Sequence, residues 1–249
     1  MTGLGGYLGR AIAALEAEAD GIAGRAMADV RDPAAVGGAL DAARPDAVIH
    51  TAYVQGGSDA RSINVDGSAT VARAARARGL RLVHLSSDVV FAGDLGRPIR
   101  EDDPVDPITD YGKTKADAES AVLAEHPGAV VVRTSLIYGG AEPSRHEQLA
   151  LDPAMTFYDD EIRCPIAAPD LAAAVLELAA RPDIRGPLHV AGADAVSRLE
   201  FAQIVARANG RNPAELNGGP RPPGRPGDLS LDCALALSLL DTQPRGVRG

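Results

Sequence analysis

The stretch Thr2-Gly3-Leu4-Gly5-Gly6-Tyr7-Leu8-Gly9 decides the fold of this chain, because it spaces glycines by three residues directly before a helix-like run. Gly3, Gly6 and Gly9 permit a tight turn, a close approach of the backbone to a pyrophosphate and close helix packing. The free N–H groups at the start of a following helix, here residues 10–19, would bind the anion. A chain with 27 glycines also produces this spacing by chance, so the turn needs support from the segments that follow.

Beyond the turn, strand-like and helix-like segments alternate. Strands are expected near 21–25, 46–52, 80–86 and 129–134, and helices at 33–44, 58–78 and 109–125. Strands separated by helices of this length predict right-handed parallel crossovers. The predicted fold is therefore α/β, a Rossmann-type doubly wound parallel sheet.

The strand that should lead into the glycine turn is not visible. Such a sheet needs a central first strand of about five or six residues, whereas only Met1 and Thr2 precede Gly3. We therefore expect that the first strand is truncated and that the native protein begins several residues upstream. The alternative is a short variant whose other strands close the gap.

The sequence pattern changes after Tyr138, where loops containing proline connect shorter predicted helices and strands. A strand is expected at 155–158, a helix at 170–180, a strand at 187–191 and a helix at 197–208. These elements predict a small C-terminal lobe, some of whose parts return to the main sheet. The Gly/Pro-rich stretch 218–227 is either an ordered loop near the cleft or a floppy tail.

Composition and charge exclude several classes of binding partner. With 25 basic and 34 acidic residues the formal charge is −9, which argues against nucleic acid and against an anionic membrane surface. The longest apolar run, Leu171 to Ala180, is too short to cross a bilayer. Cys164 and Cys233 are expected to be free thiols in a reducing cytoplasm, and no metal site is proposed. His50 and His84 lie in strand-like runs, where packed, hydrogen-bonded side chains are expected.

The chain's only two lysines lie in Tyr111-Gly112-Lys113-Thr114-Lys115, and every other basic residue is arginine. On a helix, Tyr111 and Lys115 would share one face, with Cβ atoms about 5–6 Å apart. The compact ammonium is expected to lower the pKa of the phenol and to make Tyr111 a proton donor or acceptor near neutral pH. The alternative is an accidental pair on a helix surface.

A third candidate for a catalytic residue lies at the end of a predicted strand. The run Arg81 to Asp88 is rich in β-forming residues and finishes in the hydroxyl residues Ser86 and Ser87. A buried parallel strand delivers such residues to the carboxyl edge of its sheet, where ligands bind. We therefore select Ser87.

Together these features resemble the extended short-chain dehydrogenase/reductase family, and more narrowly its dTDP-4-dehydrorhamnose reductase branch of sugar-nucleotide enzymes. The matching segments are Thr2 to Gly9, Asp29 to Asp32, Val48 to Ala52, Asn64 to Gly67, Leu85 to Phe91, Glu101 with Pro104 and Pro107, Tyr111 to Lys115, Arg133 to Gly139, Asp170 to Ala172, Arg225-Pro226 and Leu231-Asp232.

The resemblance implies an NAD(P)H-dependent reductase of a keto group on a sugar nucleotide. Residues 1–138 would form the NAD(P)-binding domain and residues 139–249 the smaller substrate-binding lobe. Ser87 would hydrogen-bond the reacting carbonyl, Tyr111 would donate the proton, and Lys115 would bind the nicotinamide ribose and tune Tyr111. Cofactor contacts are expected from Gly3, Gly6, Tyr7, Leu8, Gly9, Arg25, Asp29, Val30, Thr51, Ala52, Tyr111 and Lys115.

Further residues bear on the choice of cofactor and on the substrate. Arg25 ends the second strand, where an arginine can accept a 2′-phosphate, so NADP(H) is expected over NAD(H); the alternative is a solvated surface arginine. Asn64 either makes a structural hydrogen bond or is satisfied within its own helix. The lobe residues His146, Glu147, Arg163 and Cys164 match no substrate motif.

Two other functions stay open at this point. One is a catalytically idle NAD(P)-binding regulatory or scaffold protein, and the other is a sugar-nucleotide epimerase or dehydratase. A homodimer is compatible with all of them.

Overall fold

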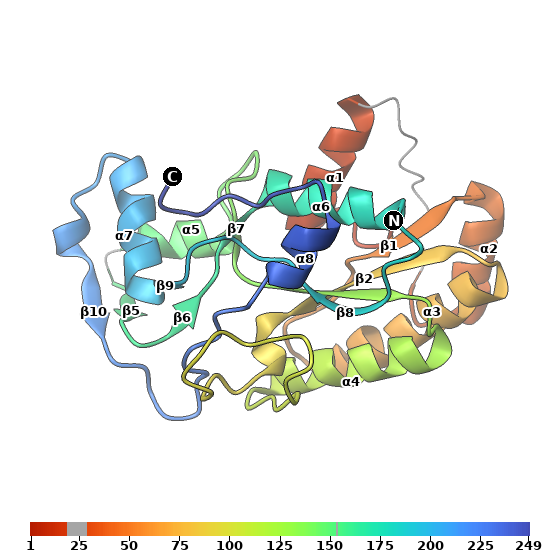
Figure 1. Cartoon of the computed structure of the whole chain (residues 1–249), viewed down its shortest axis with the longest axis horizontal. Helices are drawn as coiled ribbons and strands as arrows, with labels where there is room; N and C mark the ends of the chain where they lie inside the picture. Colours follow the sequence, from red (N-terminus) through yellow and green to blue (C-terminus); the bar gives the residue numbers. More distant parts are fainter. Residues whose placement is uncertain (19–28, 153) are drawn as a thin grey trace.

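The computed structural model describes residues 1–18, 29–152 and 154–249. Its centre is a four-stranded parallel sheet in the order β1-β2-β3-β8 (Figure 1). The strands are β1 (Ala47–His50), β2 (Arg81–Ser87), β3 (Val130–Thr134) and β8 (Gly186–His189). The parallel α/β architecture predicted from the alternation is confirmed. The strand expected at 21–25 falls outside the described residues.

Successive residues of the central strands face two different hydrophobic clusters. Val83 and Leu85 of β2 join one cluster, and Leu82 joins the other. Val132 and Val131 of β3 divide in the same way. Because both faces of the sheet are covered, apolar side chains in the middle of β2 and β3 point to both faces of the sheet. Each fully buried side chain of this size stabilises the fold by about 1.5–3 kcal/mol.

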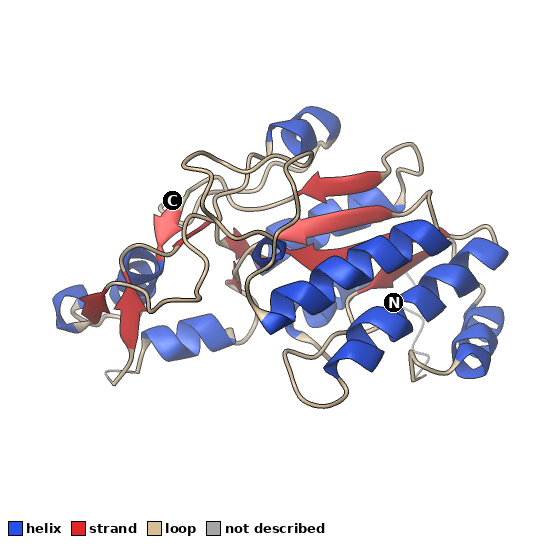
Figure 2. Cartoon of the chain, turned by 90° about the horizontal axis from the view of Figure 1, so that it is seen from below, coloured by secondary structure: helices blue, strands red, loops and turns tan. Residues whose placement is uncertain are grey.

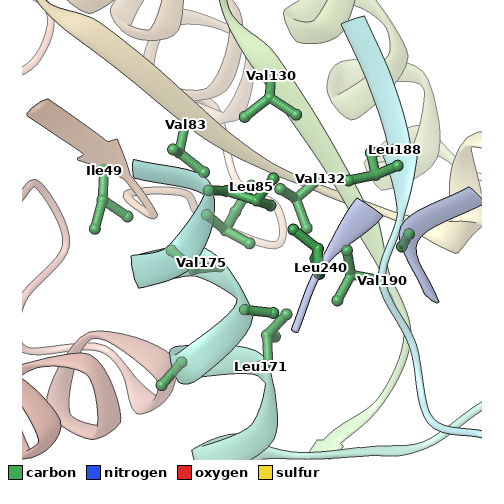
Figure 3. Packing of buried hydrophobic residues seen from close by; sticks show 14 of the residues in the cluster. Ile49, Val83, Leu85, Val130, Val132, Leu171, Val175, Leu188, Val190 and Leu240 are labelled. Atoms are coloured by element: carbon green, nitrogen blue, oxygen red, sulfur yellow. The ribbon is translucent and has the colours of Figure 1, made fainter. Parts of the chain in front are cut away.

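Helices cover the two faces of the sheet as separate layers. On one face lie α1 (Tyr7–Glu18), α6 (Ala168–Ala179) and α8 (Ala234–Leu239), and Figure 3 shows Leu171 and Val175 of α6 packed below the strands. On the other face lie α2 (Pro33–Ala43), α3 (Ser68–Ala77) and α4 (Asp110–Glu125), which Figure 2 shows side by side in front of the sheet. No helix in the described ranges is long and apolar enough to span a membrane.

The helix expected over 58–78 contains a change of geometry. A π-helical turn (Ser62–Gly67) precedes α3, and it buries Asn64. The Asn64 side chain accepts a hydrogen bond from the Val54 N–H at 2.9 Å and donates to the Val54 carbonyl at 2.8 Å and to Thr114 Oγ1 at 3.0 Å. The structural hydrogen bond expected of Asn64 is confirmed, and it joins a loop to α4 rather than serving its own helix.

The part of the chain after Tyr138 contributes to two regions. Strand β8 and helices α6 and α8 belong to the main sheet and its cover, and the short strands β4 (Ile137–Tyr138) and β7 (Ile166–Ala167) pair with each other. The remaining elements gather around a separate cluster that includes Phe157 and Phe201, at the left of Figure 1. They are α5 (Arg145–Ala150), β5 (Thr156–Tyr158), β6 (Ile162–Arg163), β9 (Val196–Ser197), α7 (Arg198–Ala208) and β10 (Asn217–Gly219). The functional division at residue 138 stays a prediction.

The Gly/Pro-rich stretch 218–227 begins in β10 and continues as an ordered loop. Arg221 pairs with Asp160 at 2.7 Å, and Arg225 pairs with Glu161 at 2.8 Å. These ion pairs fix the loop against the residues just before β6, so the floppy-tail alternative is wrong.

The chain enters the glycine turn beside β1. Thr2 forms a parallel bridge with His50: its N–H donates to the Ile49 carbonyl at 3.0 Å, and its carbonyl accepts from the Thr51 N–H at 3.3 Å. In the described residues, this bridge is the part of the expected first strand that is present.

Candidate active site

A cavity of 480 Å³ lies at the carboxyl edge of the sheet. It is enclosed by the glycine turn, the ends of β2 and β3, the start of α4 and part of the lobe. Among the residues predicted for the site, Gly6, Tyr7, Leu8, Gly9, Thr51, Ser87, Tyr111 and Lys115 line it. The structure therefore brings the three catalytic candidates together with most of the glycine turn.

The glycine turn is closed so tightly that side chains would not fit. A Cβ atom on Gly9 would lie 2.4 Å from the carbonyl oxygen of Gly3, and one on Gly3, which has φ +75°, would lie 2.5 Å from Thr51 Oγ1. The turn leads directly into α1, whose first N–H groups have no partner within the helix. Gly6 and Gly9 thus border the cavity as a backbone cradle that fits the pyrophosphate of a dinucleotide.

Ser87 is the last residue of β2, and its side chain faces a buried carboxylate. Its Oγ donates to Asp88 Oδ1 at 3.1 Å and accepts weakly from the Val89 N–H at 3.5 Å. Asp88 is fully buried and also accepts a hydrogen bond from Ser135 Oγ at 2.6 Å. Asp88 therefore sets the direction of the Ser87 hydroxyl.

Tyr111 lies in the first turn of α4, which Thr109 caps through a 3.0 Å hydrogen bond from the Gly112 N–H. Its ring stands 5.7 Å from the ring of Tyr53. Burial raises the pKa of Tyr111, and the charges of Tyr53 and Asp88 raise it further. The prediction of a lowered phenol pKa is therefore wrong for this structure, since removal from water outweighs any effect of a nearby cation.

Lys115 is buried, and its Nζ donates to the backbone carbonyl of Leu85 at 2.5 Å. Burial lowers the pKa of its ammonium to about 8. The helix places Lys115 and Tyr111 at the same cavity, as the spacing predicts, but the ammonium is fixed to β2. It also lies 5.8 Å from the centre of the Tyr53 ring.

Asn64 organises this part of the cavity. It clamps Val54, the neighbour of Tyr53, and reaches Thr114, whose Oγ1 donates to the Tyr111 carbonyl at 2.8 Å. The π-helical turn is thus the device that holds the loop carrying Tyr53 against α4. Such turns frequently occur at functional sites.

Other predicted cofactor residues lie elsewhere. Of the described residues, Gly3, Asp29, Val30 and Ala52 do not line this cavity. Asp29 pairs with Arg31 at 2.6 Å, and Val30 joins the hydrophobic cluster on the α3 side of the sheet. Arg25 lies outside the described residues. The cofactor roles of these residues stay predictions.

The two strand histidines are packed as expected, but only one is hydrogen-bonded in the described chain. His50 contacts Thr2 Oγ1 at 2.6 Å and Ser68 Oγ at 2.9 Å. His84 lies 5.3 Å from His50, ring to ring, and both of its ring nitrogens lack a partner among the described residues. Burial lowers the pKa of both imidazoles, so they are neutral packing groups.

Sequence reasoning assigned no role to Asp88, Arg145, His146 and Arg163, all of which line the cavity. The position of Asp88 directly after Ser87 was a usable signal, because a strand end that presents one side chain to a cleft presents its neighbours too. The other three come from the lobe, 58 or more residues along the chain from Ser87. No local pattern links them to it.

Comparison with known proteins gives one consistent family. The profile of the RmlD substrate binding domain matches residues 1–248. A probable dTDP-4,6-dihydroxy-2-methyloxan-3-one 4-ketoreductase of Streptomyces antibioticus is 34% identical, covering 87% of this chain and 78% of the relative. A dTDP-4-dehydrorhamnose reductase of Mycolicibacterium smegmatis is also 34% identical, covering 91% of this chain and 75% of the relative.

A relative with a different name is nearly as similar. The methionine adenosyltransferase 2 subunit beta of Pongo abelii is 31% identical, covering 79% of this chain and 65% of the relative.

Solved structures agree on the fold. A dTDP-4-dehydrorhamnose reductase from Clostridium acetobutylicum is 26% identical, with a TM-score of 0.83, covering 99% of this chain and 94% of the other. A Bacillus anthracis dTDP-4-dehydrorhamnose reductase in complex with NADP has a TM-score of 0.85 at 22% identity, covering 98% of this chain and 93% of the other, which shows the fold alone. The predicted resemblance to this reductase branch is confirmed.

Proposed function

Because the chain belongs to the RmlD substrate binding domain family, we propose that it is an NAD(P)H-dependent reductase of a keto group on a sugar nucleotide. One observation carries the proposal: Ser87, Tyr111 and Lys115 line the same cavity as Gly6 and Gly9. This arrangement joins a cradle for a dinucleotide to the groups that a carbonyl reduction needs.

The cofactor would lie on the glycine turn, with its pyrophosphate at the start of α1 and its ribose near Lys115. When bound, it supplies the hydride. The sugar nucleotide would approach from the lobe formed by residues 139–249, since Arg145, His146 and Arg163 close that side of the cavity.

Tyr111 holds the proton that the reduced carbonyl oxygen needs. Its raised pKa keeps the phenol protonated until charge develops on that oxygen. Below a pH of about 8 Lys115 is charged and favours the same negative charge. The Ser87 hydroxyl would turn from Asp88 Oδ1 to the substrate carbonyl and so orient it.

For the cofactor we infer a preference for NADP(H) over NAD(H). The support is the sequence position of Arg25, at the end of the second expected strand, where an arginine accepts a 2′-phosphate. NADPH should bind more tightly than NADH, and Arg25→Asp should reverse or erase the difference. Equal dissociation constants for the two cofactors in the wild-type protein would remove this role from Arg25.

A second candidate is an NAD(P)-binding subunit without turnover of its own. It is favoured by the 31% identity to a protein named as a subunit of a methionine adenosyltransferase. Against it stand Tyr111 and Lys115, because a binding protein has no need of both at one cavity.

A cofactor-oxidation screen separates the two functions. The wild-type protein is mixed with NADPH or NADH and a panel of keto sugar nucleotides, and loss of the reduced nicotinamide is followed by absorbance. Catalytic oxidation with at least one substrate supports the reductase. Tight cofactor binding without oxidation across the panel supports the idle subunit.

A further inference from the structure

Tyr7 joins the glycine turn to the C-terminal lobe. It lies between Gly6 and Leu8, is the first residue of α1 and borders the cavity. Its hydroxyl accepts a hydrogen bond from the Gly140 N–H at 2.7 Å and donates to Glu147 Oε2 at 3.4 Å. These two partners stand 133 and 140 positions further along the chain. The phenol therefore uses both a donor and an acceptor function to hold a distant segment against the turn.

The close approach of Tyr7 to the lobe requires a glycine there. A Cβ atom on Gly140 would lie 2.9 Å from the Tyr7 hydroxyl oxygen, so the phenol comes this close because residue 140 has no side chain. Burial raises the pKa of Tyr7 by more than the Gly140 N–H lowers it, and the Glu147 carboxylate raises it as well. The hydroxyl is therefore protonated at neutral pH and able to donate.

Glu147 carries this contact on to residues that line the cavity. Its Oε2 also accepts from the Ser144 N–H at 2.7 Å, and Ser144 Oγ accepts from the Glu147 N–H at 3.2 Å. This reciprocal pair is the capping box of α5, the helix whose first turn places Arg145 and His146 at the cavity. The start of α5 is thus fixed to the start of α1 through one carboxylate.

A second contact between the same two segments is weaker. Arg10, one helical turn after Tyr7, approaches Glu142 at 3.4 Å, and the two side chains are 54% and 75% exposed. Ion pairs this exposed contribute little to stability, because water and salt screen them. Of these two contacts, that of Tyr7 is therefore the one able to couple α1 to the segment 139–147.

We propose that Tyr7 is a positioning residue that couples cofactor binding to substrate binding, because it ties the segment 139–147 of the lobe to the backbone that holds the dinucleotide. This inference rests on the proposed function. A dinucleotide bound at the first N–H groups of α1 immobilises the residue whose side chain holds the lobe. The sugar nucleotide then has less of the lobe left to order. Each ligand therefore tightens the binding of the other by the same factor.

The first experiment needs no substrate. Hydrogen exchange of the full chain is followed by mass spectrometry with and without saturating NADP⁺. In the wild type, NADP⁺ should slow exchange in the glycine turn and also in 139–147, where the N–H groups of Gly140 and Ser144 donate to Tyr7 and Glu147. In Tyr7→Phe, which lacks one hydroxyl, saturating NADP⁺ should still protect the turn but should no longer slow exchange in 139–147.

Two further variants keep the test decisive. Gly140→Ala breaks the same contact from the lobe, since its Cβ meets the Tyr7 hydroxyl oxygen, and it should reproduce the result of Tyr7→Phe. Tyr158→Phe removes the same atom from a tyrosine beneath Arg225 and should behave as the wild type does. The proposal is overturned if NADP⁺ does not protect 139–147 in the wild type, or protects it equally in Tyr7→Phe and Gly140→Ala.

The second experiment measures the coupling itself. dTDP-glucose, a sugar nucleotide without a keto group, is titrated by calorimetry with and without saturating NADP⁺. The wild type should bind it at least about fivefold more tightly with NADP⁺. Tyr7→Phe and Gly140→Ala should bind it with nearly equal dissociation constants in the two conditions, and an unchanged ratio would contradict the coupling. If dTDP-glucose does not bind, the sugar-nucleotide function fails, while hydrogen exchange still decides whether Tyr7 transmits cofactor binding to the lobe.

Discussion

The Nζ atom of Lys115 lies 2.5 Å from the backbone carbonyl oxygen of Leu85, so the one buried ammonium described at the cavity is fixed to strand β2. The spacing of Tyr111 and Lys115 predicts a shared helix face, and both residues do line one cavity. The structure adds that the lysine is held from the strand side, next to Ser86 and Ser87. The hydrogen bond to β2, and not a contact with Tyr111, therefore fixes the position of the Lys115 charge.

The burial of Lys115 should make stability depend on pH. Below pH 8 the ammonium is charged in the folded and unfolded chains, and its burial costs stability. Between its folded pKa of about 8 and its ordinary value of 10.5 the folded chain releases the proton first. The unfolded chain then binds more protons, so this group makes stability rise with pH across that window, by about 3 kcal/mol.

In denaturant unfolding, the wild type should show this rise in unfolding free energy with pH, and Lys115→Met should lack it. The matched control is Lys113→Met, since Lys113 is 58% exposed and pairs with Asp110 at the surface. Its pH dependence should follow the wild type. Parallel curves for the wild type and Lys115→Met would contradict the buried, shifted ammonium.

Gly9→Ala should damage the glycine turn, because its Cβ would lie 2.4 Å from the Gly3 carbonyl oxygen. We expect a loss of about 1–3 kcal/mol in unfolding free energy and a large loss of NADP⁺ affinity. Gly5→Ala is the control, since a Cβ there meets nothing within 4 Å. It should change stability by less than about 0.5 kcal/mol. Equal effects of the two alanines would show that the turn is not closed as described.

Asp88→Asn should strongly destabilise the fold, because it leaves Arg163 buried without its counter-charge. Breaking a buried ion pair from one side costs about 3–5 kcal/mol. The double variant Asp88→Asn/Arg163→Gln should lose less than the sum of the two single variants. Unfolding free energies of the four proteins measure the coupling, and simple additivity would show that the pair does not interact.

Local sequence patterns predicted the parallel α/β architecture of this protein. The β-rich run around Leu82, Val83 and Leu85 predicts a buried strand, and the glycine turn predicts a helix after it. In the structure α1 begins at Tyr7, inside the turn, and not at residue 10 as expected. Ser87 could be selected because a buried parallel strand ends at the carboxyl edge of its sheet, and Tyr111 because it stands four residues before one of the chain's only two lysines.

What the sequence could not predict depends on contacts between distant segments. The direction of the Tyr111 pKa shift depends on how completely the folded chain buries the phenol, which no local motif encodes. Arg163 lies on a strand of two residues, and its relation to Asp88 exists only after the lobe has packed against the sheet. The Asn64 clamp likewise requires a π-helical turn that composition does not reveal.

The measurement that tests the central claim most directly is the turnover of Tyr111→Phe on a keto sugar nucleotide that the wild-type protein reduces. Removing the phenolic hydroxyl should lower kcat about 10²–10⁴-fold, while NADPH binding stays within about twofold of the wild type. Tyr158→Phe, which removes the same atom from a tyrosine beneath Arg225, should turn over normally. A Tyr111→Phe rate close to that of the wild type, on the same substrate, would contradict the proposed role of Tyr111 and with it the reductase mechanism.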